Sequence, residues 1–135
     1  MHIIIEDLVE KLDLEEKIIG ILQYGSSLQT EDLDEFSDID ILIVIKDEFF
    51  YEQSRGCITL NNIKVEYFIE TEMEIYKDFL DELDTFIPIN RNRFLTGKIL
   101  RDTDNKLVAL KERANKMNSM PYSRHELNRY KKKCS

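Results

Sequence analysis

The stretch Asp38-Ile39-Asp40-Ile41-Leu42-Ile43-Val44-Ile45 decides the fold, because it is the clearest β-strand in the 135-residue chain. Its apolar residues form an unbroken run, which is typical of a central strand buried on both faces of a sheet. Asp38 and Asp40 stand at its start. Side chains two residues apart in a strand share a face, so these two carboxylates lie on one side, with Cα atoms roughly 6.6 Å apart.

Two carboxylates beside an apolar core indicate a cation site. Like charges repel and burial removes them from water, so leaving them unpaired is costly. Magnesium prefers one or two carboxylates together with phosphate oxygens and water. Two such ions about 4 Å apart clamp the attacking and leaving oxygens of an in-line displacement. Asp38 and Asp40 therefore predict a magnesium site that takes a phosphate-containing ligand.

A second motif, Tyr24-Gly25-Ser26-Ser27, ends another apolar β-rich run, and 11 residues separate Ser26 from Asp38. Glycine lets the backbone come close to a ligand. Exposed N–H groups and a hydroxyl at the start of a helical turn, capped by Ser26 or Ser27, face a phosphate. The motif is expected to bind phosphate next to the metal that the aspartates bind.

A third carboxylate is expected on a neighbouring strand. Residues 57–60 and 63–69 are β-rich, and the turn-prone Asn61-Asn62 between them predicts a tight hairpin. In the second run the apolar side chains alternate, and Glu66 lies on the opposite face. Its role would be third metal ligand or general base for an acceptor hydroxyl. Glu70 shares that face and is the rival.

Apolar residues at helical spacing predict helices at residues 3–13, 71–83 and 107–117. Thr71 is the expected cap of the second and Asp104 of the third. A capping box at Ser123 opens a further helix.

The remaining elements complete an α+β domain. Pro88 breaks the stretch after the second helix, and residues 97–101 are a short strand or a loop entry. The order of elements predicts a mixed β-sheet with helices packed against it.

The chain length suits one domain. We expect this domain over residues 1–118, with residues 119–135 as the start of a C-terminal helix. That helix belongs either to a truncated helical domain or to a chain that a partner completes.

Composition excludes several classes. No apolar run is long enough to cross a bilayer, and the start lacks the features of a signal peptide. Cys57 and Cys134 stand far apart and are expected to be reduced thiols of a cytoplasmic protein. The net charge of −8 argues against general nucleic-acid binding.

The charge is unevenly distributed along the chain. Residues 91–135 carry 13 basic and 4 acidic side chains, whereas residues 1–90 carry 6 and 23. Three interpretations fit: an anionic ligand held against the basic half, a docking surface, or two halves that attract each other. Solvated helix faces are the simplest explanation. Four basic residues are candidates to reach a triphosphate, or else cover the surface: Arg91, Arg93, Lys98 and Arg101.

The Gly-Ser pair, the spacer and the Asp-x-Asp strand together resemble the nucleotidyltransferase superfamily of the polymerase-β type. The nearest members are small bacterial ones: aminoglycoside and lincosamide adenylyltransferases, and minimal nucleotidyltransferases paired with HEPN-type toxins. The resemblance covers residues 18–70 well and residues 71–133 loosely. The antibiotic-modifying relatives carry a helical C-terminal domain, and this chain stops where that domain would begin.

The resemblance implies a role for each matching residue. Asp38 and Asp40 would bind magnesium and the nucleoside triphosphate. Ser26, after Gly25, would contact phosphate, and Ser37 matches the serine before the first aspartate. Glu66 matches the later carboxylate.

Three functions follow from this resemblance. The first is transfer of AMP from ATP to a hydroxyl of an antibiotic-like small molecule or of a protein. The second is an antitoxin-like module that docks on a HEPN-type toxin. The third is an inactive, truncated nucleotide-binding domain. A protein partner or a homodimer is compatible with each, and the acceptor is not specified.

Overall fold

The computed structural model describes residues 2–25, 38–49, 55–84 and 88–119. Its strands are β1 (Ile18–Tyr24), β2 (Asp38–Ile45), β3 (Arg55–Leu60), β4 (Ile63–Thr71) and β5 (Lys98–Asp102). Its helices are α1 (His2–Lys11), α2 (Glu72–Asp81), the short 3-10 helix η2 (Glu82–Asp84), α3 (Ile89–Thr96) and α4 (Lys106–Ser119). The predicted helix at Ser123 and the predicted cap at Ser26 or Ser27 lie outside the described residues.

The described strands form one mixed sheet in the order β3-β4-β2-β1-β5. Strands β2 and β4 run parallel, and the other neighbouring pairs run antiparallel. The predicted central position of β2 is confirmed: Ile39 and Ile41 are 0% exposed on one face, and Val44 is 0% exposed on the other. The α+β class with a mixed sheet is thereby confirmed.

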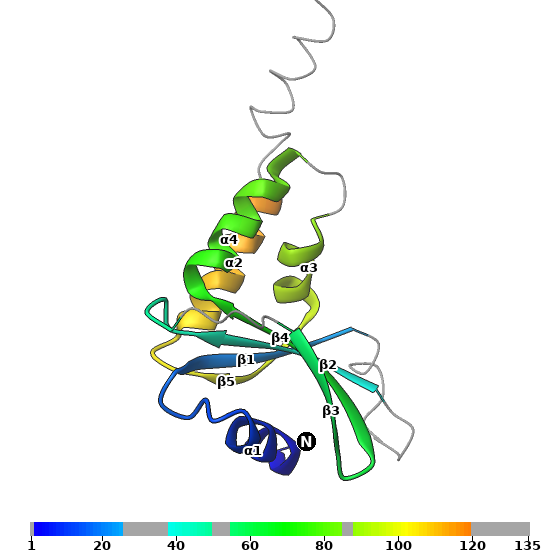
Figure 1. Cartoon of the computed structure of the whole chain (residues 1–135). Coiled ribbons are helices and arrows are strands. Elements are labelled where there is room, and N and C mark those ends of the chain that lie inside the picture. The colour runs from blue at the N-terminus through cyan, green and yellow to red at the C-terminus, as the bar shows by residue number, and fades with distance from the viewer. Residues whose placement is uncertain (1, 26–37, 50–54, 85–87, 120–135) are drawn as a thin grey trace, which may run out of the picture.

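Helices cover both faces of the sheet (Figure 1). Helix α1 packs under one face, where Leu8 and Val9 join the alternate residues of β2 in a first apolar cluster. Helices α2, α3 and α4 cover the other face, where Phe79, Phe94 and Leu107 build a second cluster. Alternation along β2 supplies both clusters, since successive side chains of a strand point to opposite faces.

The predicted hairpin joins β3 to β4. Asn61 and Asn62 have φ of 50° and 64°. Two consecutive left-handed residues make the turn that matches the twist of a two-residue hairpin, and asparagine tolerates this conformation better than most residues. The turn fixes the register that places Cys57 opposite Glu66.

Two helix starts show how local hydrogen bonds set the boundaries. Thr71 caps α2 as predicted, because its Oγ1 accepts from the Glu74 N–H while Glu74 Oε1 accepts from the Thr71 N–H. The predicted cap of α4 is wrong. The Asp102 carboxylate accepts from Leu107 N at 2.8 Å and from Val108 N at 3.2 Å. Asp104 instead occupies the turn before the helix, with φ of 56°.

Helix α3 was not predicted from the sequence, in which Pro88 marked only a break. It begins after Pro88, which makes no side-chain capping bond, and ends before Gly97. Its cap comes from Glu82, whose carboxylate accepts from Asn90 N at 2.6 Å and from Arg91 N at 3.1 Å. Only a folded chain brings this cap to the helix, so local sequence carries a weak signal for it.

No helix in the described part of the chain is both long and apolar enough to cross a membrane.

Candidate active site

A row of side chains crosses four strands on the face covered by α2, α3 and α4. Asp40 pairs with Tyr24 on β1 and with Glu66 on β4, and Glu66 pairs with Cys57 on β3. Register partners in a sheet present their side chains on the same face. The ladder therefore brings Asp40 and Glu66 together although 25 residues separate them in the sequence.

The carboxyl groups of this row interact directly. The pKa of Asp40 is raised, first by its burial, then by the charge of Glu66 and a hydrogen bond to it, and then by the charge of Asp38. A raised pKa means that the ionised form of Asp40 is disfavoured at this place. The structure thus brings Asp38, Asp40 and Glu66 close enough for their charges to interact.

One cation lies beside this cluster on β4. Lys64 Nζ lies 3.5 Å from Glu66 Oε1, and both side chains are about half exposed, at 50% and 49%. The pKa of Lys64 is raised, first by its electrostatic interaction with Cys57 and then by a hydrogen bond to Glu66. An exposed ion pair of this kind contributes little to stability. It involves Glu66 and does not include the more buried Asp40.

Gly25 forms a wall of the site immediately after β1. Its φ is 85°, and a Cβ built on it would lie 2.6 Å from Asp40 Oδ2. Only glycine combines this conformation with such a close approach of the backbone to a carboxylate. The neighbouring predicted residues, Ser26 and Ser37, lie outside the described residues.

The carboxylates of this cluster can be compared with the ligands that magnesium uses. Within residues 2–25, 38–49, 55–84 and 88–119, no three His, Cys, Asp or Glu side chains are grouped as a complete metal site. Magnesium commonly uses one or two carboxylates and completes its octahedron with phosphate and water oxygens. Asp40 with Asp38 or Glu66 is a donor set of this type, and its mutual repulsion is what a cation relieves.

Arg93 places a guanidinium over the same face. It lies 4.7 Å from the ring centroid of Tyr24 and 5.1 Å from that of Phe68, and its Nη1 donates to Asn90 Oδ1 at 3.2 Å. Tyr24 is the register partner of Asp40. The positive charge of Arg93 also acts to lower the pKa of Asp40, against the larger raising effects of burial, Glu66 and Asp38. Of the basic residues considered from the sequence, this one stands beside the carboxylates.

The other three basic residues are placed differently. Arg91 is 5% exposed, and its Nη2 donates to the Glu82 carbonyl at 3.2 Å. Lys98 pairs with Gln23 on β1, and Gln23 pairs with Ile41 on β2. Ile41 belongs to the apolar cluster under α1, so the side chain of Lys98 lies on the α1 face of the sheet. Arg101 forms an ion pair with Glu15 at 2.5 Å.

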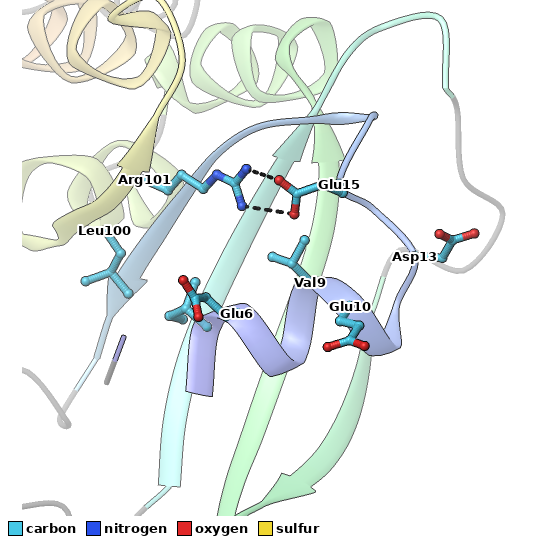
Figure 2. A pocket seen from close by; sticks show the side chains of 8 residues that line it. Glu6, Val9, Glu10, Asp13, Glu15, Leu100 and Arg101 are labelled. Atoms are coloured by element: carbon cyan, nitrogen blue, oxygen red, sulfur yellow. Dashed lines mark hydrogen bonds and ion pairs between the residues drawn. The ribbon is translucent and has the colours of Figure 1, made fainter. Parts of the chain in front are cut away.

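The ion pair of Arg101 lies in a hollow on the α1 face (Figure 2). The hollow has a volume of about 650 Å³ and an apolar floor that includes Val9 and Leu100. Acidic side chains of α1 surround it, among them Glu6 and Glu10. The sheet separates this hollow from the carboxylate row.

A second carboxyl pair was not predicted from the sequence. Burial, followed by the charge of Asp78, raises the pKa of Glu70 to about 7, and a hydrogen bond to Asp78 makes a smaller contribution. Burial also raises the pKa of Asp78. Glu70 pairs with Val44, four residues along the ladder from Asp40. The proposed rival of Glu66 therefore bonds to α2 and does not join the Asp40 row. The i+4 spacing of Glu70 from Glu66 gave its face, but no sequence signal pointed to Asp78.

Comparisons with known proteins bear on the fold. No family model matches the chain, and no curated protein matches its sequence. Among solved structures, it is similar to a nucleotidyltransferase-like protein from Exiguobacterium sibiricum 255-15, with a TM-score of 0.59 and 14% sequence identity. The match covers 82% of this chain and 37% of that one. At this identity the likeness concerns architecture, and the chain has a nucleotidyltransferase-like fold.

Proposed function

We propose that the protein is a magnesium-dependent nucleotidyltransferase that moves AMP from ATP to a hydroxyl group. The observation that carries the proposal is the pairing of Asp40 with Glu66 on adjacent parallel strands, with Asp38 beside them. The likeness of the fold to a nucleotidyltransferase-like protein supports it. Three carboxylates held on one face suit a reaction that gathers negative charge around a phosphate and a metal.

The reaction requires one bond to form and one to break. The acceptor oxygen attacks the α-phosphorus of ATP, the bond from that phosphorus to the oxygen bridging the β-phosphate breaks, and pyrophosphate leaves with the bond's electrons. The acceptor hydroxyl loses its proton. Magnesium, when bound, neutralises charge on the phosphate oxygens.

The residues of the chain position these groups. Asp38 and Asp40 would hold the cation, and Glu66 would either complete its ligands or accept the proton of the acceptor hydroxyl. Glu66 is about half exposed, so an acceptor can reach it from solvent. Gly25 keeps the backbone close to Asp40, and Ser26 and Ser37 are the proposed phosphate contacts.

Calorimetric titration of ATP with and without magnesium tests the proposal. The wild type, Asp38→Ala and Asp40→Asn are compared, with Asp7→Asn on α1 as a matched control on the other face. We expect magnesium-dependent binding in the wild type and the control, and its loss in both site variants. Absence of ATP binding in the folded wild type would contradict the proposal. Binding without turnover against any hydroxyl acceptor would favour an inactive nucleotide-binding domain.

One observation favours the alternative of an antitoxin-like docking module. A groove of about 440 Å³ between α2 and α4 is lined by apolar side chains, among them Leu80 and Met117, and by the charged Glu112, Arg113 and Lys116. Leu80 is 47% exposed. A helical protein partner, including one of the HEPN type, would bury this surface. If docking is the main task, Leu80→Asp abolishes binding of a co-expressed toxin partner, whereas Asp40→Asn leaves that binding unchanged.

A further inference from the structure

We infer that Arg93 is the residue that binds a phosphate group of the nucleotide in the candidate active site. The inference rests on the proposed function, because it places an anionic ligand between Arg93 and the Asp38–Asp40–Glu66 cluster. It adds a basic group from α3, a helix that lies outside the part of the chain carrying the sequence motifs.

Helix α3 is held by hydrogen bonds to Glu82 and by packing against α2. Its N-terminal amides bond to the carboxylate of Glu82, and the Arg91 side chain bonds to the Glu82 carbonyl. Phe94 is 1% exposed and packs edge-on against Phe79 of α2, with ring centroids 5.4 Å apart. Both rings lie in the core, so α3 and the backbone of Arg93 have a fixed position over the sheet.

The Arg93 guanidinium lies over two aromatic rings next to the carboxylate row. Tyr24 is the cross-strand neighbour of Asp40, and Phe68 is two residues beyond Glu66 on the same face of β4. Arg93 lies over both rings, at 4.7 and 5.1 Å. A side chain within reach of both rings stands directly beside the carboxylate row.

The Arg93 guanidinium uses one of its N–H groups for a hydrogen bond to Asn90. Aromatic faces attract the flat cation but accept no hydrogen bonds in its plane. Asn90 Oδ1 accepts one bond from Nη1. Arginine presents five N–H donors in a rigid fork that matches the oxygens of a phosphate, and the stacked rings hold that fork in a set orientation.

The positive charge of Arg93 matters because the site carries several negative charges. A triphosphate approaching Asp38, Asp40 and Glu66 meets like charges that a single magnesium ion does not fully offset. A fixed guanidinium next to the row supplies a further positive charge without needing to be recruited from solvent. An arginine in this place therefore favours phosphate over an uncharged ligand.

The experiment measures magnesium-dependent binding of ATP and of inorganic tripolyphosphate to Arg93→Met and Arg93→Lys. Arg113→Met is the matched control, because Arg113 lies over the Tyr76 ring at 4.3 Å in the same kind of contact but on α4. We expect Arg93→Met to weaken both ligands about 10- to 100-fold, as for loss of a charged hydrogen-bonding partner. Arg93→Lys keeps the charge but lacks the fork, and should recover only part of the affinity. Arg113→Met should bind as the wild type does.

Each other outcome overturns the inference. Wild-type affinity for both ligands in Arg93→Met, with Asp40→Asn unable to bind, removes Arg93 from the site and leaves the proposed function standing. No binding by the wild type removes both. If Arg93→Met does not fold, full affinity in folded Arg93→Lys assigns Arg93 a structural task, such as offsetting the charge of Glu70 and Asp78. Loss of ATP binding with tripolyphosphate binding unchanged assigns Arg93 to the nucleoside, and also overturns the inference.

Discussion

Asp40 on β2 and Glu66 on β4 are register partners of a parallel ladder on the helix-covered face, and the charge of Glu66 helps to raise the pKa of Asp40. Parallel strands place equivalent side chains side by side without any turn between them. The spacing of these two groups is therefore set by the backbone hydrogen bonds of the sheet and by the apolar residues on either side of each.

The first prediction is that Asp40→Asn stabilises the protein in the absence of magnesium. The pKa of Asp40 is raised by burial, Glu66 and Asp38, so its ionised form opposes folding above its ordinary value of 3.8. After allowance for solvent screening we expect a gain of about 0.5 kcal/mol at pH 7, which vanishes in acid. Urea unfolding with a chelator measures it. Magnesium should then stabilise the wild type and Asp7→Asn, but not Asp40→Asn; equal stabilisation of all three would contradict a cation at Asp40.

The second prediction concerns Gly25→Ala. The new methyl group would meet Asp40 Oδ2 at 2.6 Å, and alanine disfavours a φ of 85°. We expect a loss of about 1 to 2 kcal/mol in the free energy of unfolding and a loss of magnesium-dependent ATP binding. Gly56→Ala is the control, because its methyl group meets the hydroxyl end of Tyr67 on the other face of β4. Retained ATP binding in Gly25→Ala would show that the close approach is unimportant.

The third prediction concerns the pH dependence of stability at Glu70. Its pKa of about 7 exceeds the ordinary value of 4.5, so its contribution to stability is complete below pH 4.5 and is lost as the pH rises through 7. We expect Glu70→Gln to be more stable than the wild type at pH 8, by about 1 to 2 kcal/mol, because the amide does not ionise. The difference should shrink toward pH 5. Thermal unfolding at several pH values measures it, with exposed Glu112→Gln as the control; parallel pH profiles for all three proteins would contradict a raised pKa of Glu70.

The fourth prediction concerns the start of α4. Asp102→Ala removes both carboxylate bonds to the Leu107 and Val108 amides and should cost about 1 to 2 kcal/mol in urea unfolding. Asp104→Asn should change stability by less than about 0.5 kcal/mol, because asparagine tolerates the left-handed conformation and Asp104 is exposed. The reverse order of the two losses would restore Asp104 as the cap.

The strands and the carboxylate row could be predicted because their signals are local. An unbroken apolar run marked β2, alternation marked the face of Glu66, and two asparagines marked the hairpin. Because successive side chains of a strand alternate between the two faces of a sheet, the sequence also predicted the face on which Asp38, Asp40 and Glu66 lie. The order of strands, which makes β2 and β4 neighbours, has no local signal in the sequence. The resemblance to known nucleotidyltransferases supported the expectation of a carboxylate on the strand next to β2.

The parts that could not be predicted depend on contacts between distant residues. Helix α3 has only two buried residues, Arg91 and Phe94, and takes its cap from Glu82. Without that helix the place of Arg93 could not be inferred. The interaction between Glu70 and Asp78 likewise depends on how α2 packs on β4. The predicted phosphate contacts at Ser26 and Ser37 stay predictions.

The apolar run that follows Asp40 has a consequence for hydrogen exchange. Ile39 and Ile41 flank Asp40 and are fully buried, and β2 has a strand on each side. Backbone amides in such a strand exchange with deuterium only when much of the molecule opens. Asp40 is thus attached to a buried central strand, and we expect the backbone amides of Ile39 and Ile41 to be among the last to exchange.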